Sequence, residues 1–107
     1  MNEELKRLLR ILNQQWYFRT GNEGYLRNKY GITINDLQEM MVNQDGYCDS
    51  CDKDLDTSSR WAVDHNRETG RVRGLICYSC NTGIGKLGGN ISGLTKAINY
   101  LRKHGET

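Results

Sequence analysis

The fold of this 107-residue chain is decided by two short stretches, CDSC at residues 48–51 and CYSC at residues 77–80. Two residues between paired cysteines let one tight turn present both sulfur atoms to a metal ion, and four thiolates complete the tetrahedral coordination of structural zinc. Two disulfides or a thiol redox pair are the alternatives. In the reducing cytosol that we expect for this chain, such pairs favour metal. The sequence therefore predicts a structural Zn²⁺ ion bound by Cys48, Cys51, Cys77 and Cys80.

The size and composition of the chain agree with a metal-stabilised domain. Hydrophobic residues make up 36% of the sequence and the mean hydropathy is −0.75, so the core is modest. Bound zinc contributes on the order of 10 kcal/mol to the folding of small metallo-domains. Five of the first twelve residues are charged, which is typical of neither a signal peptide nor a membrane span. We expect a cytoplasmic protein without a membrane partner.

The charge of the chain is mild overall but uneven. The net charge is +2, whereas residues 60–86 carry five basic and two acidic side chains, a local charge of +3. Such a face attracts phosphate. Equally, the basic residues offset the charge of −2 that one Zn²⁺ and four thiolates carry together. Charge alone leaves both interpretations open.

Apolar spacing predicts a mostly helical α+β fold. We expect helices over residues 5–12, 25–30, 33–41, 81–86 and 94–101, with Thr33 and Asp36 forming a capping box and Ser92 as a candidate cap. Between the cysteine pairs, the sequence predicts two strands, at residues 61–63 and 72–76, joined by a loop at residues 68–70. Trp16, Tyr17 and Phe18 are expected to be core or interface anchors, with base stacking as a minor alternative.

The residues between the cysteine pairs indicate chemistry that zinc does not need. Hydrolysis of a phosphodiester requires an attacking water, a base for its proton and positive charge for the leaving oxygen. His65 is a candidate base. Asp64 and Asn81 offer the hard oxygen ligands that suit Mg²⁺ or Mn²⁺. Because adjacent strand residues point to opposite sides, we expect only one of Asp64 and His65 to face the metal.

Each of these residues also has a purely structural interpretation. His65 alone is more often a structural histidine, and Asn81 alone is most simply a helix N-cap. Asp64 has the alternative of an ion pair with Arg71 or Arg73 across the hairpin. The two arginines share one strand face, which either contacts phosphate or is solvated.

The stretches VDHN (63–66), ETGRVRGLIC (68–77) and CN (80–81) resemble the recombination endonuclease VII family, zinc-containing HNH or His-Me finger nucleases of bacteriophages. The resemblance covers about residues 30–101. It implies a ββα-metal finger in a mostly helical domain, with zinc on the four cysteines. It also implies His65 as the general base and Asp64 and Asn81 as ligands of a catalytic Mg²⁺.

The sequence departs from the family pattern at one place. The family often has an Asp-His-Asp-His run, whereas Asn66 and Arg67 occupy its last two positions here. A second histidine that would grip the scissile phosphate is missing, and Arg67 can replace it by charge and fork geometry.

The resemblance also frames the organisation of the chain. We expect residues 30–107 to form the zinc-bound nuclease domain and residues 1–29 a helical extension. The Holliday-junction resolvases of this family are homodimers, so the extension either pairs two subunits or, the commoner fate of an apolar stripe, covers the core of its own domain.

The functional hypothesis is a metal-dependent DNA endonuclease, located in the host cytoplasm if a phage encodes it. Branched DNA, a site-specific nick and general degradation remain open as its task. The alternative is a non-catalytic zinc module that binds DNA or protein. The candidate DNA contacts are Arg67, Arg71, Arg73 and Lys86.

Overall fold

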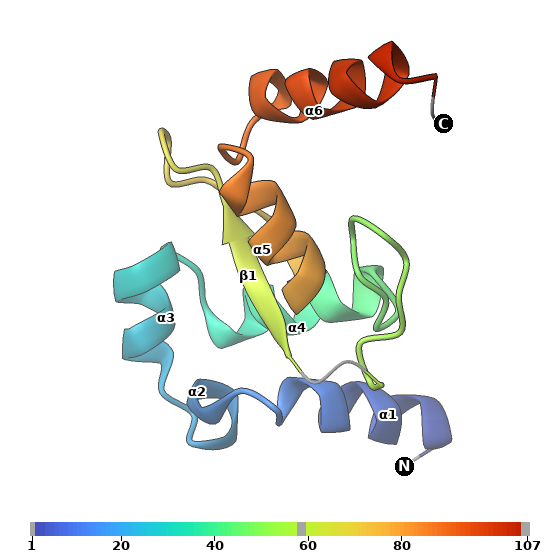
Figure 1. The fold of residues 1–107 in the computed structure, drawn as a ribbon. Helices are drawn as coiled ribbons and strands as arrows, with labels where there is room; N and C mark the ends of the chain where they lie inside the picture. The colour runs from blue at the N-terminus through green and yellow to red at the C-terminus, as the bar shows by residue number, and fades with distance from the viewer. Residues whose placement is uncertain (1, 58–59, 106–107) are drawn as a thin grey trace.

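The structure is a computed structural model that describes residues 2–57 and 60–105. Within these residues a two-stranded hairpin is surrounded by helices (Figure 1), which confirms the mostly helical α+β prediction. Helix α5 packs on both strands, and α4 contacts β2. The elements in chain order are α1 (Glu3–Leu12), α2 (Trp16–Arg19), α3 (Glu23–Tyr30), α4 (Ile34–Asn43), β1 (Trp61–His65), β2 (Val72–Cys77), α5 (Tyr78–Lys86) and α6 (Ile91–Lys103).

The predicted strands form an antiparallel hairpin with one irregularity. Pairing is regular as far as Asp64 opposite Gly74, but the next pair is His65 opposite Val72. Arg73 is therefore an extra residue on β2, a β-bulge. A bulge bends the strand and redirects the side chains beside it. This bulge lies opposite Asp64 and His65, two of the residues that are predicted to carry the chemistry.

Two predicted helix boundaries are confirmed. Gly31 ends α3 in the left-handed conformation (φ 71°), which glycine adopts without steric cost. At the start of α4, the Thr33 hydroxyl accepts from the Asp36 N–H and the Asp36 carboxylate accepts from the Thr33 N–H. Together these caps define the turn between α3 and α4.

Other helix boundaries differ from the prediction. Helix α5 begins at Tyr78, three residues earlier than expected, because the Cys77 sulfur accepts the Cys80 N–H and acts as the N-cap. Asn81 thus lies inside the helix, and its interpretation as an N-cap is wrong. Helix α6 is capped by Asn90, not by Ser92. The four-residue helix α2 was not predicted.

Helix α1 covers the core of the zinc-binding part of the chain. Its buried face packs with α4 and with Trp61, whose indole N–H donates to the Ile11 carbonyl at 2.9 Å. The Tyr17 side chain of α2 is also buried, whereas Trp16 is 45% exposed. These contacts favour the core-covering role for residues 1–29, although a boundary at residue 30 stays a prediction. The core consists of Leu8, Ile11, Leu12, Tyr17, Leu26, Leu37, Met41, Cys48, Leu55, Trp61, Val63, Leu75, Ile76 and Cys77.

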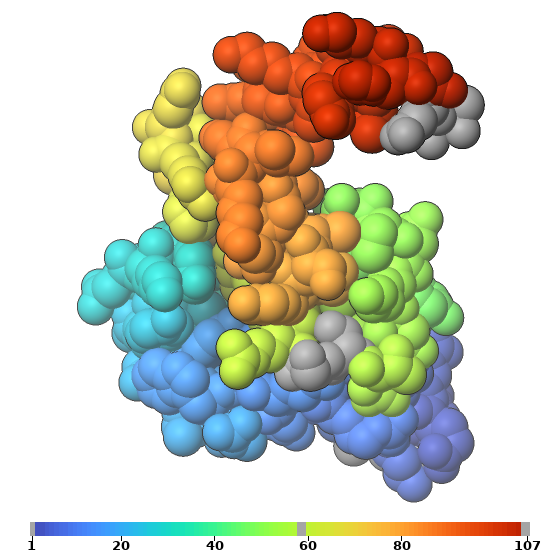
Figure 2. All heavy atoms as spheres, viewed as in Figure 1, coloured from blue at the N-terminus to red at the C-terminus, as the bar shows by residue number. Residues whose placement is uncertain are grey.

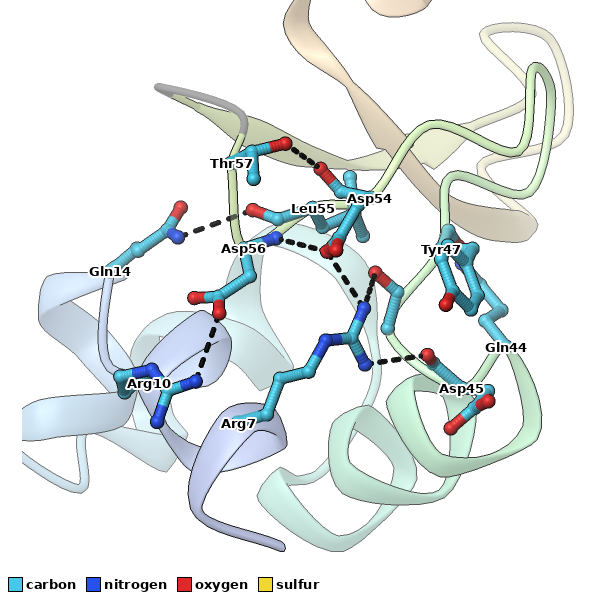
Figure 3. A network of polar contacts seen from close by, with 11 residues as sticks. Arg7, Arg10, Gln14, Gln44, Asp45, Tyr47, Asp54, Leu55, Asp56 and Thr57 are labelled. Carbon is cyan, nitrogen blue, oxygen red and sulfur yellow. Dashed lines mark hydrogen bonds and ion pairs between the residues drawn. The ribbon is translucent and has the colours of Figure 1, made fainter. Parts of the chain in front are cut away.

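A polar network ties α1 to the segment after the first cysteine pair (Figure 3). The Arg7 guanidinium donates to the Asp45 carbonyl at 2.9 Å and forms an ion pair with Asp54 at 2.7 Å. Arg10 contacts Asp56 at 3.0 Å. The network fixes the position of the loop that follows the first cysteine pair.

Gln44, directly after α4, satisfies the free edge of β2. Its side-chain amide donates to the Leu75 carbonyl at 2.8 Å and accepts the Leu75 N–H at 2.9 Å. These two bonds reproduce the pairing of a neighbouring strand, so the backbone of Leu75 has partners on this side.

Helix α6 projects from the rest of the molecule at the end opposite α1 (Figures 1 and 2). The expected apolar stripe at Leu94, Ala97, Ile98 and Leu101 is present, but no residue of α6 is buried. Among the described residues, no helix combines the length and the apolar character needed to cross a membrane.

Candidate zinc site and active-site pocket

The four cysteines converge in space as predicted. Their Sγ atoms all lie within 4.8 Å of one another, and those of Cys51 and Cys77 are 3.8 Å apart. A disulfide requires about 2.05 Å, whereas tetrahedral zinc with Zn–S bonds of about 2.3 Å separates its sulfur ligands by about 3.8 Å. The cluster thus suggests a structural zinc rather than two disulfides.

The backbone around the cluster favours a thiolate at Cys48. The Cys48 sulfur accepts N–H groups from Ser50, Cys51 and Cys77 at 3.2–3.5 Å. Burial raises the pKa of the Cys48 thiol, but these N–H groups lower it by more, to about 7. Burial and the neighbouring thiols raise the pKa of Cys80 to about 12. A divalent cation held by the four cysteines would resolve this conflict, because it would stabilise their sulfurs as thiolates.

The zinc ligands are coupled directly to the hairpin. The Asp49 N–H donates to the Leu75 carbonyl at 3.0 Å, and Cys77 is itself the last residue of β2. Gly74 lies close to Asp49, and a Cβ at this position would force the Asp49 carboxylate to move. The position of β2 therefore depends on the folded cysteine cluster.

One pocket of about 200 Å³ contains the three residues predicted to carry the chemistry. Asp64 and His65 reach it from β1, and Asn81 from α5. Because four consecutive residues of β1, 62–65, all line the pocket, lining alone does not show which way each side chain points. The expectation that only one of Asp64 and His65 faces the metal stays a prediction. Among the described residues, neither the His65 ring nor the Asn81 amide has a side-chain hydrogen-bond partner.

The Asp64 carboxylate forms a bidentate ion pair with Arg73. The arginine Nε donates at 2.7 Å and Nη2 at 3.2 Å, and Nη1 donates to the Gly89 carbonyl at 3.1 Å. The hydrogen bond with Asp64 raises the pKa of Arg73. The ion pair that the sequence offered as an alternative for Asp64 is present with Arg73, not with Arg71.

Arg67 lies over the glycines of α5 and of the turn that follows it. Its guanidinium crosses Gly85, where a Cβ would approach Nη2 to 2.7 Å, and its Nε lies close to Gly89. It lines both the pocket and an adjoining groove that ends at Asn90 and Ile91. Of the four basic residues predicted to contact DNA, the pocket includes Arg67 and Arg73. Arg71 and Lys86 are exposed and lie outside it.

Asn66 shapes the hairpin loop. Its side-chain oxygen accepts the N–H groups of Glu68 and Thr69, and its carbonyl accepts the N–H of Gly70. Gly70 has φ 76°, a conformation that glycine adopts readily. Asn66, one of the two residues that depart from the family pattern, thus stabilises the hairpin loop.

Two residues of α3, Lys29 and Tyr30, also line the pocket. The centroids of the Tyr30 and His65 rings are 5.9 Å apart, with the ring planes at 60°. Neither residue was predicted to belong to the site, because both lie in a helix far along the chain from the cysteine pairs and belong to no metal or catalytic motif. In the sequence, only the end of the predicted helix at Tyr30 and Gly31 indicates where these two residues lie.

Comparison with known proteins agrees with this architecture. The family model described as recombination endonuclease VII matches residues 23–103, which include α3. The chain is 41% identical over 75 residues to the Gene 59 protein of Mycobacterium phage D29, covering 69% of this chain and 46% of that protein. It is 37% identical over 73 residues to the Gene 59 protein of Mycobacterium phage L5, covering 67% and 44%. The chain thus spans less than half the length of these relatives. No solved structure matches it.

Proposed function

The chain belongs to the recombination endonuclease VII family, and we propose that it is a metal-dependent DNA endonuclease that hydrolyses phosphodiester bonds. Family membership implies a nuclease and hence DNA as its partner. The observation that carries the proposal is the convergence of Asp64, His65 and Asn81, from two elements joined through a zinc ligand, in one pocket beside Arg67 and Arg73.

In the proposed mechanism His65 takes the proton from the attacking water. An imidazole suits this role near neutral pH, and its ring nitrogens are not engaged by other described residues. Arg67 binds a non-bridging phosphate oxygen through its planar fork, in place of the missing second histidine. The positions of both groups in one pocket give the water and the phosphate a common site.

Asp64 and Asn81 are the residues that would hold Mg²⁺ or Mn²⁺. A carboxylate and an amide oxygen are hard donors that fit such a cation, which retains waters and completes its shell with substrate phosphate. The bound cation supplies positive charge for the transition state and the leaving oxygen. Arg73 donates one N–H to each Asp64 oxygen, so the cation would share this carboxylate with the guanidinium.

Nicking of supercoiled plasmid tests this proposal. We expect nicking with Mg²⁺ and its loss with EDTA, and we expect His65→Ala to reduce the rate at least about 100-fold, as for loss of a general base. The zinc content and melting temperature of His65→Ala should match those of the wild type. His104→Ala is the matched control, because this second histidine lies at the end of α6, far from the pocket. Equal nicking by His65→Ala and the wild type would contradict the proposal.

The DNA structure that is cut is a separate part of the proposal. Cleavage of a four-way junction, a nicked duplex and a plain duplex should be compared side by side, with the mass in solution measured. Preference for the junction by a dimer supports a resolvase. Equal cutting of all three by a monomer supports general nicking, because a single finger lacks the geometry to recognise a branch.

The Asp64–Arg73 ion pair gives the alternative function its only specific support. If the ion pair between Arg73 and Asp64 persists in the presence of Mg²⁺ or Mn²⁺, the pocket is a basic surface that binds DNA or protein without catalysis. DNA binding by the wild type without any nicking in Mg²⁺ or Mn²⁺ would favour this non-catalytic module.

A further inference from the structure

The end of α3 closes one side of the pocket that contains His65. Tyr30 is the last residue of the helix, and Gly31 turns the chain away immediately after it. The Tyr30 side chain is half-buried against the core, and its ring meets the His65 ring at 5.9 Å between centroids. Helix α3 therefore holds an aromatic ring against the proposed general base.

His65 needs such a contact to have a defined orientation. A histidine in a catalytic site is usually oriented by a hydrogen bond from one ring nitrogen to a carboxylate or carbonyl. No described residue makes such a bond to His65, whose ring can turn about two side-chain torsions. Aromatic packing against Tyr30, at 60° between the ring planes, is a restraint on the orientation of the His65 ring.

Lys29 adds a cation on the same side. Its Nζ donates to the Tyr25 hydroxyl at 3.1 Å and lies 5.5 Å from the centroid of the Tyr30 ring. The hydrogen bond to Tyr25 raises the pKa of Lys29, so the ammonium group is charged at neutral pH. Lys29 forms no ion pair with a described carboxylate, and its charge is available at the pocket.

We propose that the end of α3 is part of the active site, where Tyr30 is a positioning residue that orients the His65 imidazole and Lys29 contacts a phosphate of the bound DNA. This inference rests on the proposed endonuclease function. It assigns a role to residues outside the cysteine-flanked hairpin and outside the metal ligands. The contact between α3 and the hairpin is then required for catalysis and not only for folding.

Two substitutions of Tyr30 separate orientation from packing. Tyr30→Phe keeps the ring and removes only the hydroxyl, so kcat should stay within about twofold of the wild type. Tyr30→Leu keeps apolar volume against the core but removes the ring contact, and kcat should fall about tenfold with KM within about twofold. Zinc content and melting temperature establish that both variants fold. If Tyr30→Leu is folded and as fast as Tyr30→Phe, the positioning role is overturned.

NMR gives a readout that does not depend on activity. The chain has two histidines, and comparison with His65→Ala assigns the ring signals of His65. We expect nuclear Overhauser contacts between the Tyr30 and His65 rings in the wild type and in Tyr30→Phe. In Tyr30→Leu the His65 ring signals should shift and broaden as the ring samples more orientations. Absence of the ring contact in the wild type would overturn the inference.

Lys29 is tested by the salt dependence of DNA binding. In Lys29→Gln the KM for plasmid should rise about fivefold, with kcat little changed, and the slope of log K against log salt should decrease by about one. Lys29→Arg should retain both. Lys6→Gln is the charge-matched control, because Lys6 is exposed on α1 and pairs with Glu3. Identical behaviour of Lys29→Gln and Lys6→Gln would overturn the phosphate contact.

The outcomes for the function and for this inference remain distinguishable. Wild-type protein that binds DNA but never nicks it overturns the proposed function. In that case the Tyr30–His65 contact has no catalytic role, even where NMR detects it. Active wild-type protein with a fully active, folded Tyr30→Leu overturns the inference alone.

Discussion

Arg73 holds both carboxylate oxygens of Asp64, with its Nε at 2.7 Å from one oxygen and its Nη2 at 3.2 Å from the other. This geometry follows from the β-bulge, in which Arg73 has no partner on β1 and its side chain crosses to the neighbouring residue. The same carboxylate is the one that we propose as a ligand of the catalytic cation. Arginine and metal would therefore share Asp64, and their positive charges would repel each other.

This charge repulsion predicts that removal of Arg73 strengthens metal binding and weakens catalysis. In Arg73→Gln, the affinity for Mn²⁺ without DNA should increase about two- to fivefold, since a partly exposed ion pair contributes under about 1 kcal/mol. Nicking should decrease, because a positive charge beside the phosphate is lost. Electron paramagnetic resonance of free Mn²⁺ measures the affinity directly.

Arg71→Gln is the control for net charge. Arg71 is exposed and lies outside the pocket, yet its removal changes the charge of the hairpin equally. Its Mn²⁺ affinity should stay close to that of the wild type. A similar increase in both variants would mean that general electrostatics, and not the Asp64 contact, sets the affinity.

The zinc site makes a prediction that depends on the different burial of its ligands. Cys77 is 1% exposed, whereas Cys51 is exposed. If zinc holds the fold, Cys51→Ser and Cys77→Ser should both lose the metal and unfold, since on the order of 10 kcal/mol of metal binding exceeds the margin of a small domain. Elemental analysis and circular dichroism measure both effects. A folded, zinc-free Cys51→Ser protein would show that the cysteines act only through packing.

The sequence was sufficient for those parts of the fold that follow local rules. The capping box at Thr33, the stop at Gly31 and the two strands depend on neighbouring residues and were predicted correctly. The start of α5 was not, because a cysteine sulfur took the capping role that sequence patterns assign to Asn or Ser. The Cys77 sulfur makes this cap locally, with the N–H of Cys80 three residues later.

The pocket was predictable only in part. The convergence of Asp64, His65 and Asn81 follows from the hairpin and the zinc ligands that join it to α5. The orientation of Asp64 and Arg73 depends on a single extra residue in β2, which no alternation pattern reveals. The contribution of Lys29 and Tyr30 depends on how α3 packs against the hairpin, a tertiary contact without a local signature.

The Arg7–Asp54 ion pair predicts a contribution to stability that does not change between pH 7 and pH 5.5. The Asp56 N–H, together with Arg7 and against the effect of burial, lowers the pKa of Asp54. A lowered carboxyl pKa stabilises the folded state above the ordinary value of about 3.9, and the contribution is lost only as the pH falls through the folded pKa. Asp54→Asn should therefore cost about 1 kcal/mol at both pH values, since the pair is partly exposed.

Urea unfolding of zinc-loaded protein at the two pH values measures this difference. Asp52→Asn is the control, because Asp52 is exposed and its φ of 65° is one that asparagine tolerates. It should unfold at the wild-type urea concentration. An Asp54→Asn effect that disappears between pH 7 and pH 5.5 would contradict the assigned pKa direction.

Two glycines of α5 give the sharpest test of the role of Arg67. Glycine inside a helix costs about 1 kcal/mol relative to alanine, so both Gly83→Ala and Gly85→Ala should stabilise α5. A Cβ at Gly83 meets nothing within 4 Å. A Cβ at Gly85 would lie 2.7 Å from Arg67 Nη2, and the end of this flexible side chain must move away.

The two variants should therefore agree in stability and differ in activity. Because Arg67 lies between the pocket and the adjoining groove, its displacement in Gly85→Ala should raise the KM for DNA and reduce kcat/KM about tenfold. Gly83→Ala should cut DNA as the wild type does. The double variant of Gly85→Ala with Arg67→Gln should be no slower than Arg67→Gln alone, because both changes remove the same contact. Equal loss of activity in the two glycine variants would instead indicate that flexibility of α5, and not the position of Arg67, limits the reaction.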